Sequence, residues 1–171
     1  MSKSQSLNNK EIVVILNNIR SNENVGSIFR TADATGVSKI ILCGYTPAPV
    51  DRFGRENKGL TKASLGAEKN VKWEKVENLK EAVNNLQNFF SKNFAIIGIE
   101  QDKKAIDYHE LKNSKLASHT SNLVFVFGNE VDGLSKEDLE LCDVVAQLPM
   151  LGNKESLNVS VCAGIILYSL I

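Results

Sequence analysis

The chain has 171 residues and a mass of 18.8 kDa, and its 43% hydrophobic and 23% charged residues exclude an intrinsically disordered protein. Its 20 basic and 20 acidic residues cancel, but residues 1–75 carry 12 basic and 7 acidic residues, while residues 76–171 carry 8 and 13. From the length we expect a single domain over 1–171, with a polar tail at 1–10. From the uneven charge we expect that the N-terminal half of this domain can present a basic face to a polyanion.

Six short apolar runs predict the strands of a sheet. They are mostly continuous rather than alternating, a pattern typical of strands buried on both faces of a parallel sheet. Segments with apolar residues at helical spacing fall between several of them, at 25–32 and 79–90. This order predicts an α/β fold. The predicted strands are 12–16, 39–43, 71–73, 94–99, 123–127 and 144–148.

The segment that begins near Ser156 is predicted to form the last helix, and apolar residues occupy almost its whole circumference. A helix of this kind has to be covered on all sides. In a chain of one domain, the sheet can cover one side and a second subunit the other. We therefore predict a homodimer.

The two ends of the chain indicate the localisation of the protein. The polar start lacks the apolar core of a secretory signal, so we expect a cytoplasmic protein. The most apolar stretch, 159–171, is interrupted by Ser169 and is shorter than the roughly 20 residues that a membrane-spanning helix needs. We expect no membrane span.

Several common enzyme sites are missing from the sequence. There is no GxGxxG dinucleotide motif, no P-loop lysine and no GxSxG nucleophile elbow. Gly128 and Gly133 have P-loop separation, but Leu134 and Ser135 follow where the motif requires Lys and Ser or Thr. The two histidines and three cysteines lack the spacing of a zinc site or a disulfide framework, so we expect reduced, buried thiols and no metal.

Three clusters of polar residues and glycine remain, each beside a predicted strand or helix end. In the first, residues 18–33, Asn24 is a candidate N-cap, Gly26 allows a ligand to approach the backbone, and Arg30 projects from the following helix. A capped helix with a surface arginine explains the same residues without any binding site.

The second and third clusters lie in the last third of the chain. At 126–135, Gly128 and Glu130 follow a predicted strand, and ligands of parallel sheets bind beyond the carboxyl ends of strands, although a plain tight turn also fits. At 148–160, Ser156 is a candidate cap of the last helix. Asn158 is a polar residue at the root of this apolar element, and if buried it needs a backbone or ligand partner.

Taken together and in this order, the three clusters resemble the three sequence motifs of the SpoU/TrmH family of RNA ribose 2′-O-methyltransferases. The resemblance runs from about residue 11 to 171 and includes the segment 62–68. It implies the SPOUT fold, a parallel-sheet α/β/α sandwich with a C-terminal trefoil knot that holds S-adenosylmethionine, and a homodimer with the last helix in the interface. The chain pattern could not have predicted a knot, because connection rules argue against one.

The resemblance also implies the reaction and its residues. The methyl group of S-adenosylmethionine would pass to a ribose 2′-hydroxyl of tRNA or rRNA, with tRNA favoured because compact members of the family act on it more often. Arg30 would touch the hydroxyl and Asn24 would position that region. A guanidinium with a pKa of about 12.5 or more suits a stabiliser of the developing alkoxide better than a general base. The remaining implied residues are Glu130, Ser156 and Asn158 in the catalytic site and Gly98, Gly128, Leu148 and Leu157 around the donor.

Residues 44–59 hold two of the three prolines and are predicted to form a long functional loop. There, Arg52 and Arg55 beside Phe53 and Gly54 suit phosphate contacts with RNA, although a solvated basic face has the same composition. Two other functions stay open. One is an RNA-binding relative without catalysis, and the other is an α/β protein that binds a small molecule or nucleotide.

Overall fold

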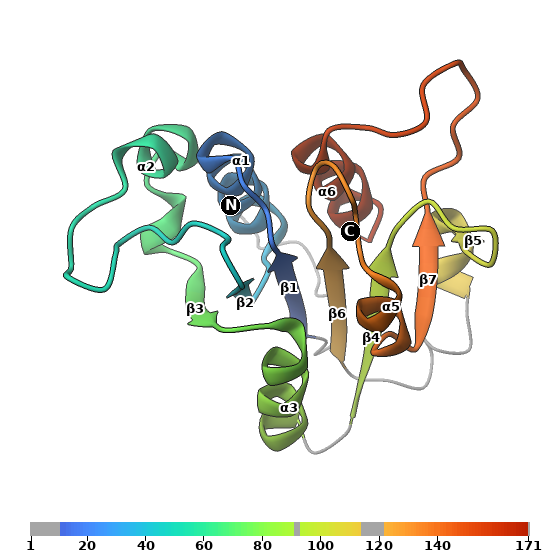
Figure 1. Ribbon diagram of the computed structural model, residues 1–171, viewed down its shortest axis with the longest axis horizontal. Helices are drawn as coiled ribbons and strands as arrows, with labels where there is room; N and C mark the ends of the chain where they lie inside the picture. Colours follow the sequence, from blue (N-terminus) through green and yellow to red (C-terminus); the bar gives the residue numbers. More distant parts are fainter. Residues whose placement is uncertain (1–10, 91–92, 114–121, 171) are drawn as a thin grey trace, which may run out of the picture.

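The computed structural model describes residues 11–90, 93–113 and 122–170. Seven strands form one sheet in the order β3-β2-β1-β6-β4-β7-β5, and all six pairings are parallel (Figure 1). The fold is therefore α/β, as predicted. The strands are β1 (Glu11–Asn17), β2 (Lys39–Cys43), β3 (Lys72–Val76), β4 (Phe94–Ile99), β5 (Ile106–Asp107), β6 (Asn122–Phe127) and β7 (Val144–Gln147).

Helices cover both faces of the sheet. They are α1 (Asn22–Thr35), α2 (Lys58–Ser64), α3 (Leu79–Phe90), α5 (Lys136–Glu140) and α6 (Val159–Tyr168). Successive residues of a strand point to opposite sides, and here both sides are apolar, so each face of the sheet needs a cover. Val14 and Leu16 of β1 belong to one core with α1, α2 and α6, while Val13 and Ile15 belong to a second core with α3 and α5 (Figure 1). This arrangement confirms the α/β/α sandwich, while the trefoil knot stays a prediction. The 3-10 turns are η1 (Ala67–Lys69) and η2 (Tyr108–Asn113).

The six predicted strands are confirmed, β2 and β4 with their predicted bounds, β1, β6 and β7 within one residue at each end, and β3 with a larger difference. β3 runs three residues beyond the predicted 71–73, because it lies at the edge of the sheet, where charged side chains can remain in water. One of these, Glu74, forms an ion pair of 2.7 Å with Lys39 on β2. The predicted loop 44–59 is also shorter, since Asn57 caps α2 and the helix begins at Lys58.

The sequence did not predict β5, α2 or α5, which are all short. β5 has two residues at the other edge of the sheet, and α5 has no buried residue, so neither has an apolar period to detect. In the described ranges, no helix combines the length and apolar character needed to cross a bilayer.

Candidate functional site

A cavity of about 460 Å³ lies at the carboxyl edge of the sheet, beyond β4, β6 and β7. Its size is within the range of small-molecule sites, and its position is where parallel sheets bind ligands. Each of the three strands continues directly into the wall, and the start of α6 completes it. The lining residues are Ile99, Glu100, Gln101, Phe127, Gly128, Asn129, Glu130, Val131, Asp132, Gly133, Gln147, Leu148, Met150, Ser156, Leu157, Asn158, Val159 and Cys162.

A chain of side-chain hydrogen bonds joins the three polar clusters at the rim of this cavity. The Asn24 amide on α1 donates to Glu130 Oε1 at 2.8 Å. The Asn158 amide in turn donates to Asn24 Oδ1 at 3.1 Å, although 134 residues separate the two in sequence. Asn158 Oδ1 accepts bonds from the backbone N–H and hydroxyl of Ser160 at 2.9 and 2.7 Å. The fold therefore assembles the three clusters into one site.

Glu130 is the centre of this network. Besides the Asn24 amide, its carboxylate accepts the backbone N–H groups of Arg20 at 3.1 Å and Ser21 at 3.3 Å, in the turn before α1. Partial burial acts to raise the pKa of Glu130, but these three hydrogen bonds outweigh it and hold the pKa below its ordinary value. Glu130 is therefore ionised at neutral pH and positions the turn, rather than donating a proton.

Two helix caps differ from the sequence prediction. Ser21, not Asn24, caps α1, since its side chain accepts the Asn24 backbone N–H. Asn158, not Ser156, caps α6, which begins at Val159, and Asn158 is exposed rather than buried. Several residues able to cap a helix stand close together in both clusters, so the local sequence alone does not decide between them.

Gly26 also has a different role from the predicted one. A Cβ at this position would lie 2.5 Å from the carbonyl oxygen of Leu60 and 2.6 Å from the Cβ of Ala63. The close approach that requires glycine is therefore that of helix α2, and not that of a ligand. The packing of α2 against α1 depends on this contact.

Most of the predicted donor-binding residues line the cavity. Gly128, Leu148 and Leu157 are in its wall, whereas Gly98 is not. A Cβ on Gly98 would lie 3.0 Å from Cys142 Sγ, on the face of the sheet that α3 and α5 cover. Glycine at this position therefore lets the segment around α5 pack closely on β4. A Cβ on Gly128 would come within 2.3 Å of the Gly133 backbone, so glycine there lets the turn after β6 close on itself.

The predicted catalytic residues divide into two groups. Glu130, Ser156 and Asn158 line the cavity, and Asn24 is bonded to two of them. Arg30 does not line it. Arg30 is on the exposed side of α1, about 9 Å further along the helix axis than Asn24, and its side chain has no hydrogen bond or ion pair among the described residues. A single chain therefore does not bring Arg30 to the cavity.

Several residues of the wall were not predicted from the sequence. Glu100 and Gln101 follow β4, and the strand-end rule applied to the second cluster would also have found them. Glu100 Oε2 accepts the Leu134 backbone N–H at 2.7 Å, and the Gln101 amide donates to the Leu148 carbonyl at 2.7 Å, so the two residues tie the walls of the cavity together.

The charge and acidity of the wall restrict its chemistry. Glu100, Glu130 and Asp132 line the cavity, and no lysine or arginine is among its described lining residues. Such a wall repels phosphate groups and favours a cationic ligand. Burial, and next the charge of Glu100, raise the pKa of Cys162 to about 12, so this thiol stays protonated and is no nucleophile.

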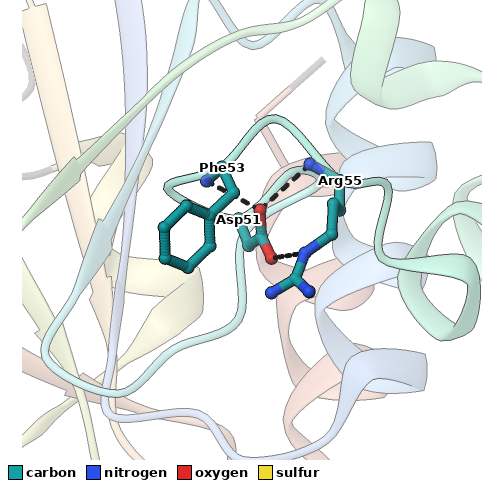
Figure 2. A network of polar contacts seen from close by, with 3 residues as sticks. All are labelled: Asp51, Phe53 and Arg55. Carbon is teal, nitrogen blue, oxygen red and sulfur yellow. Dashed lines mark hydrogen bonds and ion pairs between the residues drawn. The ribbon is translucent and has the colours of Figure 1, made fainter.

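The two predicted RNA-binding residues lie outside the cavity, on the loop between β2 and α2. Arg52 and Arg55 are both exposed, and Arg55 Nε lies 2.7 Å from Asp51 Oδ2 (Figure 2). Their guanidinium groups are 4.8 and 5.1 Å from the centre of the Phe53 ring. The loop thus gathers two cations around one exposed aromatic side chain.

Comparisons with known proteins agree with this geometry. The tRNA (guanosine(18)-2′-O)-methyltransferase of Aquifex aeolicus is 33% identical over 159 residues, which cover 93% of this chain and 68% of that protein. The 23S rRNA (guanosine-2′-O-)-methyltransferase RlmB of Neisseria meningitidis is 32% identical over 163 residues, covering 95% and 59%. The AdoMet-bound rRNA methyltransferase from Sinorhizobium meliloti superposes with a TM-score of 0.78 at 26% identity, covering 94% and 55%.

The chain thus spans between 55% and 68% of the length of these three relatives. The sequence profile of the SpoU rRNA Methylase family matches residues 11–168, which contain all three polar clusters and the whole described sheet. The resemblance inferred from the clusters is confirmed. The chain belongs to the SpoU rRNA methylase family.

Proposed function

We propose that this chain uses S-adenosylmethionine to methylate a ribose 2′-hydroxyl of tRNA or rRNA. The observation that carries the proposal is the hydrogen-bonded chain Glu130–Asn24–Asn158, which assembles the three clusters at the rim of one cavity. The relatives named above carry the same activity in their names, on a tRNA and on an rRNA.

The cavity suits the methyl donor. Bound there, S-adenosylmethionine would supply a methyl group on a positively charged sulfur, and transfer of that group removes the charge. Three carboxylates line the wall, which favours this cation over a nucleotide phosphate. Gly128, Leu148 and Leu157 line the cavity outside the helices and strands, where backbone groups are free to bind the adenine and ribose of the donor.

The chain must also hold the 2′-oxygen in line with the methyl group, at roughly 3–3.5 Å, and favour loss of its proton. Glu130 is occupied by three hydrogen bonds and acts as a positioning residue. The protonated Cys162 thiol is no base either. We assign to Arg30 the stabilisation of the developing alkoxide, because a guanidinium remains charged and presents several N–H donors.

In our proposal, Arg30 of one subunit contributes to the cavity of a second subunit and not to the cavity of its own chain. On α6, Val161, Ile165 and Tyr168 are 50%, 37% and 54% exposed, although the opposite side of the helix is buried. A second copy of the chain would cover this apolar face. Since α1 packs beside α6, a dimer formed there can bring Arg30 of one subunit to the cavity of the other (Figure 1).

The finer choices rest on the sequence and the relatives. We favour tRNA over rRNA as substrate, we expect a reaction that needs no metal, and we place the protein in the cytoplasm. Ser156 lines the cavity beside Asn158 and is exposed, so we assign it to the part of the wall where the donor and the substrate meet.

S-adenosylhomocysteine, the product form of the donor, should stabilise the protein. At 100 times its Kd it is expected to raise the Tm by roughly 5–10 °C, since binding at that excess contributes about 2.7 kcal/mol. ATP should produce no shift, because the carboxylates of the wall repel its phosphates. Differential scanning fluorimetry measures both shifts on the intact chain.

The matched control is Ser156→Trp, which places an indole in the cavity at an exposed position and should remove the shift without lowering the Tm of the free protein. A shift with ATP and none with S-adenosylhomocysteine would instead support the nucleotide-binding alternative and overturn the proposed function.

A further inference from the structure

The loop between β2 and α2 ends in an ordered tip that is organised by one carboxylate. Asp51 Oδ1 accepts the backbone N–H groups of Phe53 at 2.8 Å and Arg55 at 3.0 Å, while Asp51 Oδ2 pairs with Arg55 Nε at 2.7 Å (Figure 2). These hydrogen bonds lower the pKa of Asp51, so the carboxylate is ionised at neutral pH. The three bonds to Asp51 thus give the tip a defined conformation.

The tip is also fixed relative to the proposed active site. Val50 and Glu56 form an antiparallel bridge at its base, and the Asn57 backbone N–H donates to the Pro49 carbonyl at 2.8 Å. The Asn57 amide donates to Asn22 Oδ1 at 2.7 Å, and Asn22 is the first residue of α1. The loop is therefore tied to the helix that carries Asn24.

Phe53 is 66% exposed at this tip, and it belongs to neither of the two cores. The guanidinium groups of Arg52 and Arg55 lie over this ring, 4.8 and 5.1 Å from its centre, so a base that stacks on the ring takes the place of one of them. A phenyl ring in water contributes nothing to the core, but a ring flanked by two cations combines the groups with which proteins bind unpaired nucleotides. The ring stacks on the base, and the cations contact the adjacent phosphates.

We propose that Phe53 is a stacking platform for an unpaired base of the RNA substrate, outside the nucleotide that is methylated. This inference rests on the proposed function, because it presumes an RNA ligand. Stacking requires a base whose face is free, so the platform selects RNA loops over duplexes. A ring has no hydrogen-bonding group, so the platform tolerates any of the four bases.

The test compares Phe53→Leu, which keeps an apolar side chain without a π-face, with Phe53→Trp, which restores one. The probe is a hairpin RNA with a seven-nucleotide loop that contains 2-aminopurine, whose fluorescence falls when it stacks. Phe53→Leu should weaken binding by about 5- to 150-fold and abolish the quenching, while Phe53→Trp should retain both. A fully paired duplex should bind wild type and Phe53→Leu equally.

Salt dependence separates the ring from its neighbouring cations. Phe53→Leu should leave the slope of log K against log salt unchanged, since it removes no charge, whereas Arg52→Ala should make the slope shallower by about 1. Leu65→Ala, at another exposed apolar side chain just after α2, is the control and should bind the hairpin as wild type does.

Two results would overturn the platform. One is equal hairpin binding and quenching by wild type and Phe53→Leu, and the other is a change of oligomeric state in Phe53→Leu, which would make the ring an interface between copies of the chain. Both are distinct from a failure of the proposed function, which would be seen as absent stabilisation by S-adenosylhomocysteine in the wild-type protein.

Discussion

Replacing Arg30 with alanine is expected to lower the rate of RNA methylation by about 100- to 1000-fold, because the developing alkoxide loses its cationic partner. Arg30 is exposed and its side chain has no hydrogen bond or ion pair among the described residues, so the Tm should remain within about 2 °C of wild type. Stabilisation by S-adenosylhomocysteine should also persist. Single-turnover kinetics with labelled donor, alongside scanning fluorimetry, measure these quantities.

Two further variants test whether the guanidinium group of Arg30 is specifically required. Arg30→Lys keeps the charge but lacks the planar fork of donors, and we expect it to remain at least 10-fold slower than wild type. Lys80→Ala removes an exposed cation from α3, on the opposite face of the sheet, and should methylate normally. Equal rates for Arg30→Ala and Lys80→Ala would remove Arg30 from the reaction.

Mixing two inactive variants is expected to restore activity. In our proposal, a complete site combines the cavity of one subunit with Arg30 of the other. A mixed dimer of Arg30→Ala and Ser156→Trp chains therefore contains one site in which both parts are intact. With equal amounts of the two chains, about a quarter of the wild-type rate should return, since half of the dimers are mixed and each has one working site.

The experiment needs subunit exchange, which mass spectrometry of differently tagged chains can verify. Each variant alone, taken through the same exchange, is the control and should remain inactive. If verified mixed dimers are as inactive as their parents, Arg30 acts within its own chain or not at all. A protein that sediments as a monomer at assay concentration would equally contradict the shared site.

The parts of the fold that the sequence predicted are those with a clear apolar pattern. β1, β2, β4 and β6 are continuous apolar runs because both faces of each strand are buried. The short helix α5 has no buried residue and therefore no such pattern, and it was missed. Periodicity thus reports burial, and elements that bury little do not show it.

The candidate site was predicted by residue type and position along the chain, but not in its geometry. The polar side chains of Asn24, Glu130 and Asn158 were identified, but their mutual hydrogen bonds depend on tertiary structure. The caps were wrong because Ser21 and Asn24, like Ser156 and Asn158, are interchangeable by local preference.

The position of Arg30 relative to the cavity could not be predicted from the sequence either. Its distance from the cavity depends on the direction in which α1 presents each residue, and this is fixed by packing against the sheet, α2 and α6. The exposed apolar face of α6 was implied by composition, because a helix that is apolar all round cannot be covered by one sheet alone.

Ribose methylation is tested by incubating the purified chain with methyl-labelled S-adenosylmethionine and RNA from cells that lack the gene, and then digesting the RNA to nucleosides. We expect label in a single 2′-O-methylated nucleoside, with the methyl group on the ribose, and loss of this label in Arg30→Ala. Label on a base, or a protein that binds the donor but transfers no methyl group to any RNA, would contradict it.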